Sequence, residues 1–339
     1  MRQLKLAIIG CGAVTELFHL PASKLVNTIE VVGLADVAEA RAKQLAERFA
    51  IPRVTNNYRE VENFAEAALV ALPNALHLPV TIDLLNRGMH VLVEKPMALT
   101  ACECDAMISA ATSSNTKLSI GLVRRFYDSS KYVKQVVDAG VLGKILKFDF
   151  REGGIFKWSG ASPSMYKKEV VGGGALMDIG VHVLDLLLWW LGDYEMVEYY
   201  DDAEGGIEAN CELHFRMRTG VNGVVELSRT RDLRNTYIIC GEKGSVELES
   251  EFDPLIHLYL RDEAVRLSGR VHDRDNSKRV IANGWSVLRA FAAQFDDFAS
   301  SVIEHREPFI PGKEGRRAID LIENCYAAKR PLSSLYHYV

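Results

Sequence analysis

The sequence has no long apolar run and no leader-like segment at its start. A membrane span needs about 18 apolar residues, whereas the longest candidate, Val183–Leu191, is shorter and contains Asp185. We therefore expect a buried helix at this position and no membrane partner. The apolar segment Leu4–Ile9 runs directly into a glycine turn instead of a cleavage site, so we expect no secretory signal.

Cysteine pairs and basic charge are also scarce. The six cysteines are scattered, with no pair of C-x-x-C clusters, so the sequence predicts no disulfide framework and no metal site. Unpaired thiols favour a cytoplasmic location. Forty Lys plus Arg against 45 Asp plus Glu give a net charge of −5. That sign argues against nucleic acid or an anionic membrane as the main partner.

The first third of the sequence alternates short apolar runs with amphipathic stretches of helical period. Continuous strands rich in Val, Ile and Leu that alternate with helices predict an α/β fold, with a doubly wound parallel sheet covered on both faces. The predicted strands are Leu4–Ile9, Ile29–Ala35, Ala68–Leu72, His90–Val93 and Lys117–Gly121. The predicted helices are Thr15–Leu25, Ala38–Phe49, Leu76–Arg87 and Cys102–Ala111, the last with Thr100 as its N-cap and Glu103 completing a capping box.

The pattern changes after about residue 122. Strands separated by tight turns follow a long apolar helix, which predicts an α+β domain with an open, mostly antiparallel sheet. A length of 339 residues fits two domains of roughly 150 residues each, and we place them at 1–122 and 123–339. The predicted strands are Lys144–Phe150, Glu195–Tyr200, Ile207–Arg218, Gly223–Thr230, Thr236–Cys240 and Ser245–Leu248. The stretch Arg261–Arg279 is expected to be a solvated excursion, and the two C-terminal helices could pack back on the first domain.

A glycine turn follows the first predicted strand. Gly10 permits a tight turn, Gly12 lets the backbone approach a pyrophosphate, and the helix that starts near Ala13 and Val14 offers its N–H groups to the phosphates. The third position of the motif is Thr15 rather than Gly or Ala, which would crowd the packing of helix on strand. The turn is a candidate nucleotide site, although an ordinary strand–helix turn would look similar.

Asp36 ends the second predicted strand. A carboxylate at this position would accept hydrogen bonds from the adenosine ribose and repel a 2′-phosphate. Asp36 could instead cap the helix that follows, or serve both purposes. Neither Val37 nor Ala38 is basic, although Arg41 lies one turn further on. We therefore predict NAD rather than NADP as the cofactor.

Two further clusters could carry chemistry. Lys95 ends the fifth predicted strand, and the carboxyl ends of such strands face the ligand crevice of an open α/β sheet. Asp178 and His182 are four residues apart, so they share a face of the predicted helix, with Asp185 on the same stripe. Taken alone, a surface lysine and a buried His–Asp pair are the commoner interpretations.

These motifs together resemble the Gfo/Idh/MocA oxidoreductases, a family named for glucose–fructose oxidoreductase and inositol dehydrogenase, over nearly the whole chain. The most specific of them is the segment from Gly172 to Asp185. The matching segments are Gly10-Cys11-Gly12, Leu72-Pro73-Asn74 with His77, Glu94-Lys95-Pro96, Gly121-x-x-Arg124-Arg125-Phe126, Gly140-Val141-Leu142-Gly143-Lys144-Ile145 and Gly172 to Asp185.

The resemblance implies an enzyme, an NAD-dependent dehydrogenase or reductase that acts on CH–OH groups. It also implies an N-terminal Rossmann domain and a C-terminal domain that binds substrate and forms a homodimer or homotetramer through its sheet. Lys95, Asp178 and His182 would be catalytic. We expect His182 to act as acid and base, Lys95 as its electrostatic partner and relay, and Asp178 as a substrate anchor. The sequence does not decide whether His182 or Lys95 accepts the proton.

The resemblance also implies contacts around the nicotinamide. Glu94 would face its ribose or form a salt bridge to Lys95, and His77 would reach the cofactor or only cap its helix. A cis peptide bond before Pro96 is a further expectation. The residues expected to bind the cofactor are Gly10, Gly12, Ala13, Val14, Asp36, Leu72, Pro73, Asn74, His77, Glu94 and Lys95.

For the substrate, the family resemblance suggests a secondary hydroxyl or ketone of a sugar, a sugar derivative (including a nucleotide-linked one) or a cyclitol. The loop from Gly153 to Val171 carries aromatic and lysine side chains that suit such a ligand. An NAD-dependent glycosidase and a non-catalytic NAD sensor or scaffold are the alternatives. The residues expected to bind the substrate are Lys95, Arg124, Tyr166, Asp178 and His182.

Overall fold

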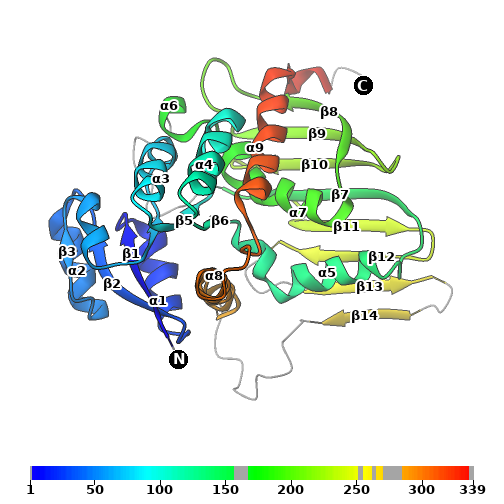
Figure 1. Ribbon diagram of the computed structural model, residues 1–339. Helices are drawn as coiled ribbons and strands as arrows, with labels where there is room; N and C mark the ends of the chain where they lie inside the picture. Colours follow the sequence, from blue (N-terminus) through cyan, green and yellow to red (C-terminus); the bar gives the residue numbers. More distant parts are fainter. Residues whose placement is uncertain (1, 156–166, 251–254, 262–264, 270–284, 336–339) are drawn as a thin grey trace.

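The computed structural model describes residues 2–155, 167–250, 255–261, 265–269 and 285–335. These residues form two sheets that lie side by side, with the long helix α8 (Trp285–Ile303) between them (Figure 1). Tyr166 and most of the predicted substrate loop lie outside the described residues.

The first sheet has six parallel strands in the order β3-β2-β1-β4-β5-β6. The order steps outward from β1 in both directions, which is the topology of a doubly wound Rossmann domain. The fold class predicted for this part is thereby confirmed. The strands are β1 (Leu4–Ile9), β2 (Ile29–Ala35), β3 (Val54–Thr55), β4 (Ala67–Val70), β5 (His90–Glu94) and β6 (Leu118–Gly121).

Helices cover this sheet much as the sequence pattern predicts, with one difference at the start. The predicted helix Thr15–Leu25 begins as a π-helical turn, η1 (Thr15–His19), before α1 (Leu20–Ser23). At the N-terminus of α4, Thr100 accepts the N–H of Glu103, but the Glu103 carboxylate accepts the N–H of Leu99 instead of that of Thr100. The other elements are α2 (Glu39–Phe49), η2 (Tyr58–Asn63), η3 (Asn74–Leu76), α3 (His77–Asn86) and α4 (Ala101–Ser113).

The second sheet has nine strands in the order β14-β13-β12-β11-β7-β10-β9-β8-β15. Only β7–β10 and β8–β15 pair in parallel, so the predicted mostly antiparallel sheet is confirmed. The strands are β7 (Ile145–Gly153), β8 (Tyr194–Asp201), β9 (Asn210–Met217), β10 (Asn222–Ser228), β11 (Thr236–Gly241), β12 (Gly244–Glu249), β13 (Ile256–Leu260), β14 (Val265–Gly269) and β15 (Lys329–Pro331).

One expectation for this sheet is wrong. Residues 265–269 belong to the stretch Arg261–Arg279 that was expected to be a solvated excursion, yet they form β14, which pairs with β13. The strand lies at the edge of the sheet and most of its side chains are exposed. An edge strand of this kind needs no apolar alternation, so the sequence pattern does not reveal it.

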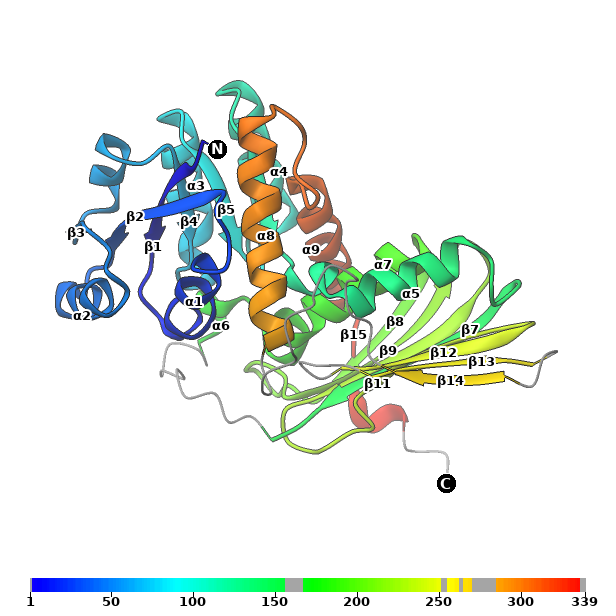
Figure 2. The same ribbon diagram turned by 90° about the horizontal axis from the view of Figure 1, so that it is seen from below.

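The helices α5 (Asp128–Asp138) and α7 (Val181–Leu191) lie on one face of the nine-stranded sheet, whereas the short η7 (Leu332–Leu335) lies on the other side of it (Figure 2). The face under α7 carries buried side chains such as Phe148 and Phe150 of β7. The C-terminal helix α8 packs against α1, β1 and β2 of the first sheet, and α9 packs against α4 and β6. The elements are η4 (Val123–Phe126), α5 (Asp128–Asp138), α6 (Lys168–Val171), η6 (Leu176–Gly180), α7 (Val181–Leu191), α9 (Gly312–Ala327) and η7 (Leu332–Leu335).

One described helical stretch, Lys168–Leu191, is long and apolar enough to cross a membrane by length and composition alone. Of its most apolar window, 67% is buried inside the protein. Core helices of globular proteins pass the same test. The stretch contains η6 and α7, and it therefore brings the Asp178–His182 pair into the middle of the structure.

Candidate active site

The glycine turn after β1 has the shape that a dinucleotide needs. Gly10 has a φ of +101°, and a Cβ at this position would lie only 2.1 Å from the carbonyl oxygen of Ala71. A Cβ at Gly12 would meet no atom within 4 Å, so the space above it is open to a ligand. Thr15 is buried, and its hydroxyl donates to the Gly10 carbonyl at 2.6 Å. Thr15, which stands where the usual motif has Gly or Ala, therefore stabilises the turn through this hydrogen bond. The open space above Gly12 fits the pyrophosphate of NAD.

Asp36 lies beside this turn, at the carboxyl end of β2. Its two carboxylate oxygens accept the N–H groups of Cys11 at 2.6 Å and of Ala38 at 2.8 Å. Asp36 therefore fixes the turn that leads to Ala38, the N-cap of α2, and also supports the glycine turn, but its side chain does not cap the helix. Arg41, the nearest basic residue in the sequence, forms an ion pair with Glu16. Its charge is thus balanced within the protein, which suits an unphosphorylated ribose.

The loops after β4 and β5 are tied together by His77. The ring is fully buried, with Nδ1 2.7 Å from the carbonyl oxygen of Pro96 and Nε2 2.9 Å from that of Leu72. The Lys95–Pro96 peptide bond is cis, as expected. Asn74 donates to the carbonyl of Val171 at 2.8 Å and so connects the predicted cofactor loop to α6.

Glu94 is a buried carboxylate at the end of β5. One oxygen lies 2.8 Å from Nε2 of the buried His19, and the other accepts the N–H of Lys95 at 3.1 Å. Burial raises the pKa of Glu94, but the contact with His19 and the charge of Lys95 outweigh it, so that the pKa lies below its usual value. Sequence reasoning missed His19, because a lone histidine in a helix gives no signal.

Lys95 is the centre of the candidate site. Its Nζ donates to the Asp178 carboxylate at 2.6 Å and to the Asp178 carbonyl at 3.0 Å. Burial is the main cause that lowers the pKa of Lys95 to about 8, with Glu94 opposing the shift and Arg229 adding to it. The other carboxylate oxygen of Asp178 forms an ion pair with Arg229. Arg229 follows β10 and was not predicted, since nothing in its local sequence marks it.

His182 lies one helical turn beyond Asp178. Burial, followed by the positive charges of Arg124 and Lys95, holds the pKa of its imidazole well below the usual range. The ring is therefore neutral at physiological pH. Its Nδ1 is buried and makes no hydrogen bond within the described part of the chain. His182 is thus close enough to Arg124 and Lys95 for their charges to act on its pKa.

The two neighbouring arginines after β6 have different partners. Arg124 donates to both carboxylate oxygens of Glu152, at 2.7 and 2.8 Å, and to the hydroxyl of Tyr237 at 2.8 Å. These bonds fix the orientation of the Arg124 side chain. Of the predicted substrate residues, Lys95 and Asp178 are in direct contact, and the charge of Arg124 acts on both Lys95 and His182.

Asp185 does not join them. Its carboxylate accepts two bonds from Arg125, at 2.9 and 2.6 Å, and Arg125 also contacts Glu314. All atoms of this pair are buried, which makes it a structural ion pair. Asp185 therefore has a structural partner and is not among the groups that contact Lys95 or Arg229. Asp178 lies in the π-helical turn η6, and the α-helix that follows carries His182 and Asp185.

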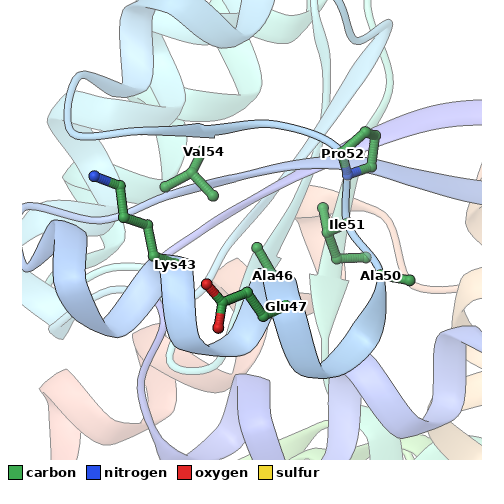
Figure 3. A pocket seen from close by; sticks show the side chains of 7 residues that line it. All are labelled: Lys43, Ala46, Glu47, Ala50, Ile51, Pro52 and Val54. Carbon is green, nitrogen blue, oxygen red and sulfur yellow. The ribbon is translucent and has the colours of Figure 1, made fainter.

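The described residues contain no group of three or more His, Cys, Asp or Glu side chains that could hold a metal ion. A surface hollow lies between α2 and β3 and shares no residue with the site around Lys95 (Figure 3). It contains none of the predicted cofactor or catalytic residues. The side chains that line it are Lys43, Ala46, Glu47, Ala50, Ile51, Pro52 and Val54.

Comparison with known proteins agrees with this geometry. Residues 4–122 match the family model described as "Oxidoreductase family, NAD-binding Rossmann fold", and residues 130–247 match the GFO/IDH/MocA C-terminal domain. Inositol 2-dehydrogenase of Salmonella typhimurium is 26% identical over 258 residues, which cover 72% of this chain and 74% of that protein. D-glucoside 3-dehydrogenase of Escherichia coli is 30% identical over 194 residues, or 56% of this chain and 54% of that protein.

The fold has close counterparts among solved structures. A levoglucosan dehydrogenase in complex with NADH and levoglucosan superposes with a TM-score of 0.84 at 21% identity, covering 96% of this chain and 98% of that one. A Rossmann domain that fits NAD, joined to a second domain that sets Asp178 against the partly buried Lys95, is the architecture of an NAD-dependent oxidoreductase. The chain belongs to the Gfo/Idh/MocA family of these enzymes.

Proposed function

We propose that the protein transfers a hydride between NAD and a secondary hydroxyl or ketone of a sugar, a sugar derivative or a cyclitol. The observation that carries this proposal is the cluster of Lys95, Asp178 and His182 at the carboxyl ends of the parallel strands. A partly buried amine beside a carboxylate, with an imidazole one helical turn away, suits the removal of a proton from an alcohol. The activities for which the relatives are named, those of an inositol and a glucoside dehydrogenase, support this class of substrate.

Lys95 rather than His182 is the better proton acceptor. An acid–base group works best when its pKa lies near the working pH. The pKa of Lys95 is lowered to about 8, which meets this condition, whereas that of His182 lies well below its usual value and makes the imidazole a weak base. His182 then holds the substrate oxygen as a neutral hydrogen-bonding partner. The sequence had assigned the larger acid–base role to His182.

Asp178 and Arg124 complete the site. The Asp178 carboxylate is partly exposed, at 41% of its side chain, so it can accept a bond from a substrate hydroxyl while it orients Lys95. Arg124 keeps a positive charge close to the alkoxide that forms as the hydroxyl proton leaves. Both side chains are held by other protein groups and need little rearrangement when the substrate binds.

NAD would be held by residues from four loops. Gly12 and the N–H groups after it would receive the pyrophosphate, and Asp36 the adenosine ribose. Leu72, Pro73, Asn74 and Glu94 would line the nicotinamide end. When bound, NAD supplies the acceptor for the hydride that leaves the carbinol carbon.

A substrate screen tests this proposal. Purified protein with NAD should form NADH, followed by absorbance, with at least one compound from a panel of sugars, nucleotide sugars and inositols. Release of sugar from an aryl glycoside without net NADH formation would point to the NAD-dependent glycosidase instead. NAD binding without turnover of any compound in a broad alcohol panel would point to the sensor or scaffold.

We also propose that two or more copies associate through the nine-stranded sheet, in the cytoplasm. The side chains on its face away from α5 and α7 include Lys147, Asp149 and Arg151, and Arg151 forms an ion pair with Glu226. The helices α5 and α7 lie on the other face, and the short η7 lies on this side, next to β8 and β15 (Figure 2). Light scattering on the purified protein should give the mass of a dimer or tetramer, and Ile238→Arg, placed on the same face, should lower it. A wild-type mass of one chain would exclude this assembly.

A further inference from the structure

A buried carboxylate holds the start of the helix that carries Asp178 and His182. Glu208, just before β9, is 3% exposed. Its two carboxylate oxygens accept the N–H groups of Gly174 at 3.0 Å and of Leu176 at 2.8 Å. Its backbone carbonyl accepts the N–H between them, that of Ala175, at 3.0 Å. One residue therefore satisfies three successive donors at a helix start that would otherwise lack acceptors.

Tyr326 of α9 fixes the carboxylate from the other side. Its hydroxyl donates to the Glu208 oxygen at 2.9 Å. Glu208 and Tyr326 thus connect α9 and the residues before β9 to the start of the helix that carries Asp178 and His182, which we call the catalytic helix. Both are more than 30 positions away from the start of that helix in the sequence, so the contact forms only when the chain folds.

The glycine run before the helix is shaped by this contact. A Cβ at Gly174 would lie 1.8 Å from the Glu208 carbonyl oxygen, and a Cβ at Gly173 would lie 1.9 Å from the Tyr326 hydroxyl. Neither neighbour can move without breaking the hydrogen bonds just described. The two glycines are therefore required for the close approach of Glu208 and Tyr326, which is a different need from the nucleotide turn at Gly10.

Two sets of hydrogen bonds connect Glu208 to Lys95. Gly174, whose N–H is held by Glu208, accepts the N–H of Asp178 on its own carbonyl at 3.1 Å. Asp178 in turn contacts Lys95 through both its carboxylate and its carbonyl. A shift of the helix start would therefore move two acceptors of Lys95 at once.

We propose that Glu208 is a positioning residue for hydride transfer, which it serves by fixing the helix start that sets Asp178 against Lys95. This inference rests on the function proposed above, because it assumes that Lys95 and Asp178 act on the substrate. Glu208 itself touches neither of them. Its effect runs through the backbone of residues 174–178.

Glu208→Gln is the decisive variant. The amide keeps the size of the carboxylate but offers one NH₂ group where two backbone N–H groups and a hydroxyl all need an acceptor. We expect kcat to fall about 10²-fold, the effect of a displacement of about 1 Å in a catalytic geometry. The KM for NAD should stay at the wild-type value, because the glycine turn lies in the other domain. Tyr326→Phe, which removes one donor to the carboxylate, should lower kcat less.

Asp201→Asn serves as the matched control. Asp201 is a buried carboxylate on β8 that pairs with Lys329 and does not contact the catalytic helix. The same exchange of carboxylate for amide should leave kcat near wild type, even where it lowers the melting temperature as much as Glu208→Gln does. A kcat for Glu208→Gln within twofold of wild type would overturn the proposal. An equal loss of kcat in the two variants at equal stability would also do so.

Amide hydrogen exchange gives a second readout that needs no substrate. Exchange in the peptides that cover residues 172–182 should rise in Glu208→Gln and stay unchanged in Asp201→Asn. Unchanged exchange in Glu208→Gln would overturn the positioning role. Absence of wild-type activity on every sugar and cyclitol would instead count against the proposed function, and the exchange measurement would still decide the role of Glu208.

Discussion

Replacing Lys95 by methionine should lower kcat for alcohol oxidation by about 10³-fold, within the range that a positioned acid–base group contributes. Methionine keeps most of the volume of the lysine stem but provides neither a proton acceptor nor a charge near the forming alkoxide. The Asp178 carboxylate would then keep Arg229 as its ionic partner. The measurement is steady-state NADH formation with the best substrate of the screen, together with NAD binding by fluorescence.

Lys117→Met is the matched control for this prediction. Lys117 directly precedes β6 of the same parallel sheet. It therefore lies at the amino ends of the strands, whereas the ligand crevice lies at their carboxyl ends. Removal of its charge should leave kcat near wild type. NAD affinity should change little in both variants. A kcat for Lys95→Met close to that of the control would remove Lys95 from the mechanism.

The pH dependence of kcat separates the two possible proton acceptors. The Lys95 amine with a pKa of about 8 is largely protonated at lower pH and cannot accept a proton. If Lys95 is the base, kcat for oxidation rises as the pH passes about 8 and then levels off. We call this rising part of the pH profile its limb. The charged groups that influence it are Glu94, Glu152, Asp178, Arg124 and Arg229.

Lys95→Arg should abolish this limb, because a guanidinium stays protonated throughout the accessible range. The expected profile is flat and low near pH 8. A limb that persists in Lys95→Arg would assign the proton to another group, with His182 as the first candidate. Its pKa lies well below the usual value, so a limb due to His182 would appear at acidic pH.

The sequence pattern predicts the first domain almost completely, because buried parallel strands are continuous apolar runs between amphipathic helices. It misses β3, which has two residues, and in the second sheet β13, β14 and β15. The strands β3, β14 and β15 lie at a sheet edge, where side chains need not alternate between buried and exposed, and β13 pairs with the edge strand β14. The π-helical turns η1 and η6 are also invisible, since they depend on how one turn of helix fits its surroundings.

Some residues of the candidate site could likewise be predicted from the sequence, and others could not. Lys95, Asp178 and His182 were predictable because each stands in a motif that links residue type to a position in the fold. Arg229, His19 and Glu208 were not, since each acts through a contact between segments far apart in the chain. Arg124 was predicted at the site, but its fixed pairing with Glu152 becomes visible only when η4 and β7 are brought together.

The second prediction with a large expected effect concerns the preference for NAD over NADP. We expect the double variant Asp36→Ser and Val37→Arg to shift the ratio of kcat/KM for NADP over that for NAD by about 10³-fold, since a like-charge contact costs several kcal/mol and each 1.4 kcal/mol is tenfold. Serine removes the carboxylate that would repel a 2′-phosphate. It keeps a short side-chain oxygen beside Cys11 and Ala38. Val37 is 92% exposed, so an arginine fits there without disturbing the core.

Glu39→Gln tests whether the effect is specific to the end of β2. Glu39 lies in the first turn of α2, and its carboxylate pairs with Lys43. Glu39→Gln removes one negative charge, as Asp36→Ser does. The charge of Glu39 lies at a solvent-exposed position, however, where salt screens its interaction with the cofactor. The NADP to NAD ratio should therefore move less than about threefold. An Asp36→Ser variant that still prefers NAD as strongly as wild type would show that the preference comes from the shape of the pocket, because the repelling charge would then be gone without effect.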